Sequence, residues 1–268
     1  MRKRLARLGT AVLALTASLA FAQDFPTQPV HLIVPFAAGG PADIQARWIA
    51  TKLGEQLKQQ VVVENKGGAG GIIGAQHVAG AAPDGHTLLF SSVGAIAISP
   101  YLRDNLTYDP KTDLTPVVRV TTASTVLVTG EHSRFSSLPE LVAYAKANPG
   151  KVTFASPGAG TSIHLGSELL KQKAGIDMVH VPYRGAGPAV TDVIAGTVDV
   201  MFADAPVVLP HIKAGKLRAL GVGSAARAPV LPDTPTIAEG GTNDVLVATW
   251  YGLMAPGKTP PAVVQQLN

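Results

Sequence analysis

Cysteine is absent from the 268-residue chain, charged residues make up only 15% of it, and aromatic residues 5%. Without a thiol the protein forms no disulfide, no thiolate zinc or iron–sulfur site and no cysteine nucleophile. A lipid-anchored cysteine behind a leader is excluded for the same reason. The 46% of hydrophobic residues, with 28 glycines and 21 prolines, is typical of a globular protein with one large domain or two medium ones.

The excess of positive charge is small and lies at the N-terminus. Of the formal net charge of +4, Arg2, Lys3, Arg4 and Arg7 supply four positives within the first 22 residues, which contain no acid. The remaining 18 basic residues balance the 18 acidic ones. A neutral body lacks the electrostatic footprint that nucleic-acid binding requires, so no nucleic-acid partner is predicted.

The first 22 residues have the three parts of a Sec-type secretory signal. A basic start precedes an apolar run over residues 8–20, and Ala20-Phe21-Ala22 forms a small-x-small cleavage site. The alternative is a membrane anchor, but the run is shorter than the roughly 20 residues that a spanning helix needs. We therefore predict cleavage after Ala22, a mature chain that begins at Gln23, and a periplasmic location.

The mature part alternates short apolar runs with longer amphipathic stretches, and most junctions carry glycine or proline, which is typical of α/β proteins. A helix is expected over residues 42–59, with apolar residues at helical spacing: Ile44, Trp48, Ile49, Leu53 and Leu57. The remaining expected helices cover residues 75–79, 162–173 and 188–195, and a short one follows Pro261. The expected strands are residues 31–34, 61–64, 87–90, 117–128, 151–155, 178–181, 198–202, 217–222 and 245–253.

These elements fall into two similar sets, which predicts two lobes. The strand over residues 117–128 is rich in β-branched residues and long enough to pass from one lobe to the other near residues 122–125. A return is expected near Gly223. The predicted first lobe is thus residues 23–123 and 224–268, and the second lobe residues 124–223.

Two loops have the composition of an anion site. In residues 34–47, VPFAAGGPADIQAR, a buried strand enters a loop of small residues and then a helix. In residues 156–164, SPGAGTSIH, the arrangement is repeated, with hydroxyls at Thr161 and Ser162 where the helix begins. Exposed N–H groups at a helix N-terminus favour an anion, and one such terminus in each lobe would face the other across a cleft.

Several side chains near these loops have two interpretations. Asp43 caps its own helix, or acts in a pocket by orienting water or accepting from a ligand. His164 is a satisfied cap histidine or a ligand contact. Arg184 pairs with a surface acid or neutralises a carboxylate, while Tyr183 could close an apolar wall. Asp204 follows an apolar strand, where a strand end opens onto the same cleft.

Motifs for cofactors and catalysis fail on context. The segment GLMAPGKT matches a phosphate loop, but Pro256, Pro260 and Pro261 remove N–H groups that would hold phosphate. GVGSAA resembles a dinucleotide-binding turn of the Gly-x-Gly-x-x-Ala kind, but Pro229 follows so soon that little room remains for the helix that such a turn requires. No Gly-x-Ser-x-Gly elbow and no close histidine pair exists, so neither a serine hydrolase site, a metal nor a cofactor is predicted.

Six segments carry a family resemblance. The first is the signal segment, and the others follow it in this order: PFAAGGPADIQAR, VVVENKGGAGGIIGA, SPGAGTSIH, VPYRGAGPAVTDVIAGTVDVMFAD and LPHIKAGKLRALGV. Over nearly the whole mature chain they resemble the substrate-binding proteins of tripartite tricarboxylate transporters, the Bug receptors. The resemblance implies an α/β, two-lobed Venus-flytrap fold of type II, each lobe a mostly parallel sheet flanked by helices. It implies a monomeric, non-catalytic receptor that delivers a small carboxylate to a large and a small membrane subunit.

Carried over by position, the resemblance also implies ligand-binding residues. Backbone groups of Ala38, Gly39 and Gly40 would hold a carboxylate, with Asp43 supporting their loop and its waters. The second lobe would bind through Ser156, Gly160, Thr161 and Ser162, with His164 beneath them. The rest of the predicted cleft comprises Phe36, Ser92, Tyr183 and Asp204.

Three alternatives stay open. Family members continue through a longer C-terminal helix, so the resemblance implies that these 268 residues are a fragment. A secreted enzyme acting on a carboxylate with Asp43, His164 and Asp204 would differ from a receptor by turnover of its ligand. The third alternative is a sensor-domain role with a signalling partner. The shared loops do not choose among di- and tricarboxylates, acidic amino acids, nicotinate and aromatic acids.

Overall fold

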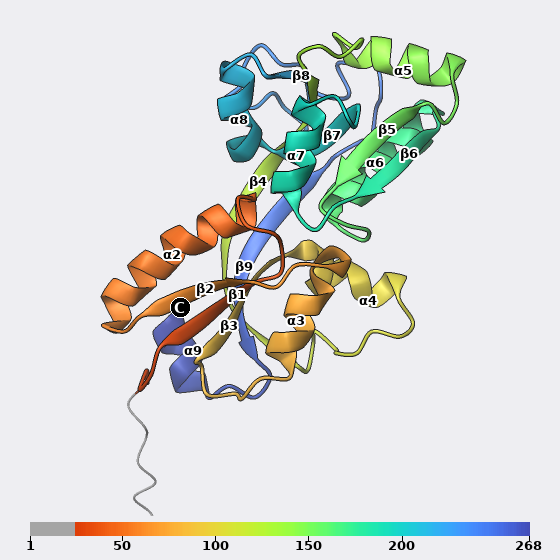
Figure 1. Ribbon diagram of the computed structural model, residues 1–268. Coiled ribbons are helices and arrows are strands. Elements are labelled where there is room, and N and C mark those ends of the chain that lie inside the picture. Colours follow the sequence, from red (N-terminus) through yellow and green to blue (C-terminus); the bar gives the residue numbers. More distant parts are fainter. Residues whose placement is uncertain (1–24) are drawn as a thin grey trace, which may run out of the picture.

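The computed structural model describes residues 25–268 and shows a mixed α/β protein with two groups of parallel strands (Figure 1). In the first strand group, β1 (Val30–Val34) lies between β2 (Val61–Asn65) and β3 (Thr87–Ser92). In the second strand group, β5 (Val152–Ser156) lies between β6 (Met178–Pro182) and β7 (Val200–Asp204). This architecture confirms the predicted fold class, while the segment predicted as a signal lies outside the described residues.

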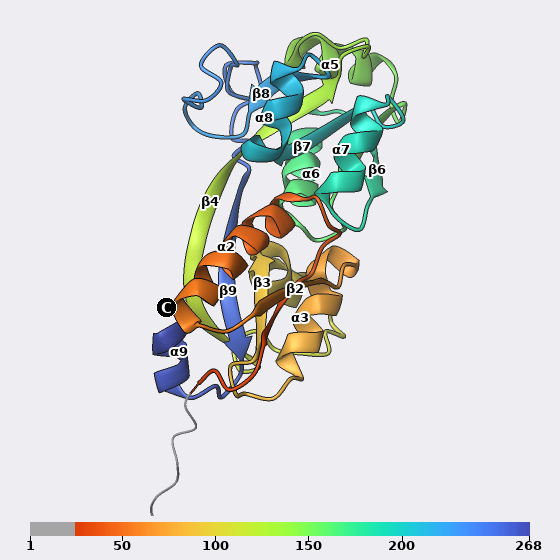
Figure 2. The same ribbon diagram turned by 60° about the vertical axis from the view of Figure 1, so that its left-hand side comes forward.

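Two long antiparallel strands join the groups. The 17-residue β4 (Leu114–Gly130) pairs with β9 (Ala248–Pro256) up to Ser124, and from Thr125 it pairs with β7. β9 also pairs with β3, and β8 (Leu217–Val222) pairs with β4. Figure 2 shows β4 and β9 side by side as they run from one strand group to the other. The expected strand over residues 117–128 is therefore longer at both ends, and it changes partners between Ser124 and Thr125.

Helices pack on both groups. The first group carries α2 (Pro41–Leu57) and α3 (Ile72–Ala79), and the second carries α6 (Ser162–Ala174) and α7 (Ala186–Ile194). The other helical segments are η2 (Ala69–Gly71), η3 (Gly94–Ile98), α4 (Ser99–Leu102), α5 (Leu138–Ala147), α8 (Ala205–Lys213) and α9 (Pro261–Leu267). From Phe25 onward, no helix has the length and hydropathy needed to cross a bilayer.

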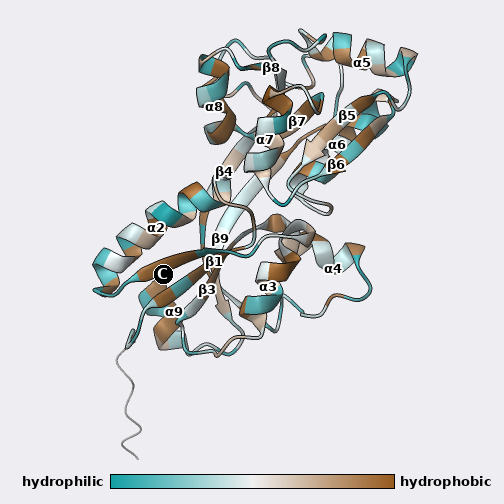
Figure 3. Cartoon of the chain, in the orientation of Figure 1, coloured by the Kyte–Doolittle hydropathy of each residue, from teal (hydrophilic) through white to brown (hydrophobic). Residues whose placement is uncertain are grey.

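The buried face of α2 is not the one that carries its largest apolar side chain. The helix ends at Leu57 because Lys58 adopts the left-handed conformation, with φ 54°. Ile44 and Trp48 share the helical spacing of Leu53 and Leu57, but 55% and 66% of their surfaces are exposed. The buried face consists of Ala42, Ala46, Ala50, Leu53 and Leu57. The small alanines let the helix backbone approach the sheet closely. Figure 3 shows hydrophilic residues at several places along α2.

The hydrophobic cores follow the two strand groups. One cluster contains Leu32 and Phe90, and a separate one contains Phe154 and Phe202. The second cluster also includes Ala228, Ile237, Val245 and Val247, which lie after the return expected near Gly223. The packing therefore favours a return at the start of β9, and we propose a division into residues 25–124 with 248–268 and residues 125–247.

Candidate functional site

A cavity lies between the two strand groups. Both groups and the joining strand β9 contribute to its wall. The lining residues are Phe36, Pro41, Ala42, Ser92, Pro157, Thr161, Ser162, Ile163, Ala186, Met201, Ala203, Asp204, Thr249 and Tyr251.

Helix N-termini converge on this cavity. Pro41 begins α2, Ser162 begins α6, Ala186 begins α7, and Asp204 immediately precedes α8. The first N–H groups of a helix have no partner within it, and the helix dipole places partial positive charge at this end. Four such termini around one cavity favour a bound anion without requiring a cationic side chain.

The side chains on the wall are mostly neutral. Ser92, Thr161, Ser162 and Thr249 supply hydroxyls, and Ser162 Oγ lies 2.6 Å from Thr249 Oγ1, which links α6 to β9. Within the described residues, no arginine, lysine or histidine lines the cavity. A carboxylate here would be bound by backbone N–H groups and hydroxyls, with the helix dipoles balancing its charge.

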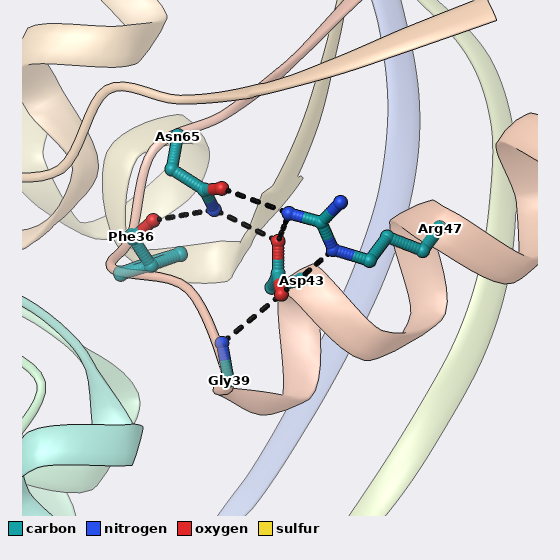
Figure 4. A network of polar contacts seen from close by, with 5 residues as sticks. All are labelled: Phe36, Gly39, Asp43, Arg47 and Asn65. Carbon is teal, nitrogen blue, oxygen red and sulfur yellow. Dashed lines mark hydrogen bonds and ion pairs between the residues drawn. The ribbon is translucent and has the colours of Figure 1, made fainter.

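Asp43 holds the first loop in place (Figure 4). Its carboxylate accepts hydrogen bonds from Gly39 N at 3.0 Å, from Asn65 Nδ2 at 3.0 Å, and from Arg47 at 3.0 and 3.1 Å. Asn65 Nδ2 also donates to the carbonyl of Phe36 at 3.0 Å. Burial acts to raise the pKa of Asp43, but these hydrogen bonds outweigh it and hold the pKa below its ordinary value. Asp43 is thus an ionised support for the loop.

Ser156 and His164 have a similar role in the second loop. Ser156 Oγ accepts from Gly158 N at 3.1 Å and contacts His180 Nε2 at 2.6 Å. His164 Nδ1 accepts from Gly160 N at 3.3 Å, and Thr161 Oγ1 donates to the carbonyl of Gly158 at 2.8 Å. These bonds fix the loop that leads into α6, so that its first turn faces the cavity.

The stacked pair of histidines below this loop predicts a pH effect on stability. The rings of His164 and His180 lie 4.2 Å apart, and burial, followed by the charge of His164, lowers the pKa of His180 to about 4. The unfolded chain binds this proton near pH 6.5 and the folded chain does not. We expect the contribution of His180 to stability to fall by about 2 kcal/mol between pH 7 and 4.5, allowing for partial exposure.

Urea unfolding at both pH values checks this expectation, with His180→Gln as the comparison. The wild type should lose more free energy of unfolding than the variant over this interval. Burial raises the pKa of Asp204 to about 6, which gives an opposite slope between pH 4 and 6, so the difference between the two proteins is the informative quantity. Equal slopes in both proteins would contradict the assignment to His180.

The structure divides the predicted site residues into two sets. Phe36, Ser92, Thr161, Ser162 and Asp204 line the cavity. The lining residues do not include the other eight predicted positions, which are Ala38, Gly39, Gly40, Asp43, Ser156, Gly160, His164 and Tyr183. Gly39 N is used by Asp43, and Tyr183 Oη donates to Asp192 Oδ2 at 2.6 Å. Burial and Asp192 raise the pKa of Tyr183 to about 12.

The acid–base groups of the enzyme alternative do not share this wall. Only Asp204 among them lines the cavity, while Asp43 is tied to Arg47 and His164 to its own loop. Sequence reasoning missed Thr249 and Tyr251, which enter from β9. These residues lie more than eighty positions after the second loop and belong to a strand with no loop motif, so local patterns carried no signal for them.

Glycines form the contact between the two strand groups beside the cavity. Ala37 N donates to the carbonyl of Arg184 at 2.9 Å across this contact. A Cβ on Gly185 would lie 2.8 Å from Ala37 N, and one on Gly94 would lie 3.2 Å from the carbonyl oxygen of Gly160. We call this contact the glycine seam, defined by Gly40, Gly67, Gly70, Gly94, Gly158, Gly185 and Gly187. It lets the two backbones approach to hydrogen-bonding distance.

Comparison with known proteins identifies the family. The family model described as "Tripartite tricarboxylate transporter family receptor" matches residues 45–268. Protein BugT of Bordetella pertussis is 40% identical over 262 residues, which cover 97% of this chain and 79% of that protein.

Two solved structures have the same fold. The periplasmic binding protein BugD is 38% identical with a TM-score of 0.87, covering 91% of this chain and 81% of that one. MatC from Rhodopseudomonas palustris with bound malate is 35% identical, also with a TM-score of 0.87, covering 91% and 83%. The chain therefore belongs to the tripartite tricarboxylate transporter receptor family, whose members are periplasmic solute-binding proteins of the Bug type.

Proposed function

We propose that this receptor captures a small organic carboxylate in the cavity between its strand groups. The observation that carries the proposal is the convergence of four helix N-termini on a wall without a cationic side chain among the described residues. The related MatC structure holds malate, a small carboxylate, and is similar over 91% of this chain. Capture here would bury the charge of the ligand against helix dipoles.

The receptor would then deliver its ligand to the large and small membrane subunits of a tripartite tricarboxylate transporter. We also propose that the N-terminal segment directs export and that the protein acts as a monomer in the periplasm. It would release its ligand unaltered. The family assignment supports this role. Contacts such as Ala37 N to the Arg184 carbonyl also support it, because they allow a closed form that membrane subunits could distinguish from an open one.

A thermal-shift panel of organic acids tests the proposed function. A ligand present at 100 times its dissociation constant should stabilise the protein by about 2.7 kcal/mol. For a protein of this size that corresponds to a rise in Tm of roughly 5–10 °C. We expect one chemical class of carboxylates to give this shift. A flat panel with a cooperative melt would contradict carboxylate capture, and a ligand altered in mass after incubation would favour the enzyme alternative.

A further inference from the structure

Asp204 is a buried acid whose position in the fold leaves one oxygen without a partner. Only 4% of its surface is exposed, and it lies at the end of β7 and at the residue before α8. An aspartate in this position ordinarily caps the helix, but its side chain makes no capping hydrogen bond. Pro206 at the second helical position has no N–H to donate.

The two oxygens of this carboxyl group differ. Tyr251 Oη donates to Oδ2, whereas Oδ1 is buried without a hydrogen-bond partner among the described residues. A buried acceptor left without a donor costs roughly 1–3 kcal/mol, and more when it is charged. Asp204 also lines the cavity, so a molecule bound there can reach this oxygen.

The surroundings do not supply a counter-charge. Ala186 from α7, Met201 and Ala203 from β7, and Phe36 from the first loop are apolar. Tyr251 from β9 is the other titratable side chain that the described residues place on the wall. Burial raises the pKa of Asp204 to about 6, against the opposing effect of the Tyr251 hydrogen bond, so the group is largely ionised at pH 7.5.

We propose that Asp204 Oδ1 accepts a hydrogen bond from the ligand, and that the ligand is a carboxylic acid carrying a hydroxyl or ammonium group besides its carboxylate. This inference rests on the proposed function and names the ligand class of the same cavity. A ligand without the donor leaves Oδ1 unsatisfied, although it brings the same carboxylate charge into the cavity as its donor-bearing analogue. Sites built to bind a donor discriminate strongly against analogues that lack one.

Matched ligands test the proposal by calorimetry at pH 7.5. The series are succinate, malate and aspartate; glutarate, 2-hydroxyglutarate and glutamate; and phenylacetate, mandelate and phenylglycine. In the series that binds, a donor-bearing member should bind at least tenfold more tightly than its unsubstituted parent. Equal or tighter binding of the parent overturns the assignment to Asp204 but leaves carboxylate capture intact. Failure of every acid to bind overturns the proposed function and this inference with it.

The Asp204→Asn variant separates the two donors. It keeps the shape of the side chain and an acceptor oxygen but removes the charge. An ammonium ligand should therefore lose at least tenfold in affinity relative to its parent, and a hydroxyl ligand less. Asp199→Asn is the control, because Asp199 bonds Thr153 and does not line the cavity. An unchanged preference in folded Asp204→Asn overturns the proposal.

A measurement on the wild type covers the case in which the variant fails to fold. Between pH 7.5 and 5 Asp204 gains a proton, so affinity for the donor-bearing ligand should fall and affinity for the unsubstituted parent should rise. Parallel profiles for the two ligands, once each is corrected for the ionisation of its own carboxyl groups, would overturn the proposal, since the other titrating groups of the protein would affect both alike.

Discussion

Replacing Gly185 by alanine is expected to weaken ligand binding at least tenfold while changing thermal stability little. The added Cβ would lie 2.8 Å from Ala37 N, which is backbone and cannot move aside. The strand groups must then separate at the glycine seam, and the hydrogen bond from Ala37 N to the Arg184 carbonyl is lost. Apparent affinity falls in proportion to the fraction of closed molecules, so a tenfold smaller closed population gives a tenfold larger Kd.

Calorimetry with a ligand found by the thermal-shift panel measures this effect. Gly94→Ala places a methyl group on the opposite side of the seam and should act in the same direction. Gly80→Ala is the matched control, because its φ is −91° and its Cβ would meet nothing closer than 3.6 Å. A Gly185→Ala variant with wild-type affinity would show that binding does not require the seam to close.

The Asp43→Ala variant should lose about 2–3 kcal/mol of unfolding free energy and bind ligand more weakly. The carboxylate is 4% exposed and joins Gly39, Asn65 and Arg47, and hydrogen bonds to a charged group contribute about 1.5–3 kcal/mol. Arg47 is largely exposed, so its share is discounted. Binding weakens because the same loop places Phe36 and the first turn of α2 at the cavity.

Urea unfolding measures the first effect, and Glu55→Ala serves as the control. Glu55 lies on the same helix and pairs with Lys52 at the surface, so its loss should change stability by less than about 1 kcal/mol. Because the pKa of Asp43 lies below its ordinary value of 3.8, its contribution is fully present at neutral pH and disappears only as the pH falls below about 4. Equal stability of the two variants would contradict this role.

The order of the strands along the chain, and the two small-residue loops that contribute to the cavity wall, could be predicted from the sequence, because both depend on local patterns. Residues 32–34 and 88–90 are continuous apolar runs, and they lie in the strands β1 and β3, where they are buried. The loops after β1 and β5 contain small residues where helices begin, and both reach the cavity. Asp204 could be named as a candidate because it stands at the end of a buried apolar strand, but a lone acid in that position is a weak signal by itself.

Features set by distant packing could not be predicted in the same way. Ile44 and Trp48 share the helical period of Leu53 and Leu57, so periodicity alone cannot show that the alanine stripe is the buried face of α2. Thr249 and Tyr251 become wall residues only because β9 inserts between β3 and β4. The segment after Gly223 stays with the second strand group through contacts such as Thr125 Oγ1 to the Val247 carbonyl, at 2.7 Å.

The β4–β9 ribbon has a mechanical consequence. Thr122 opposes Trp250 and Ser124 opposes Ala248, so the ladder continues to the point where β4 changes partners. A hydrogen-bonded ribbon bends and twists, but it has few free torsions about which two bodies can swing. We therefore expect the molecule to behave as a stiff spring. Closing the seam should therefore load the ribbon elastically, and we expect its recoil to reopen the cavity once the seam contacts are broken.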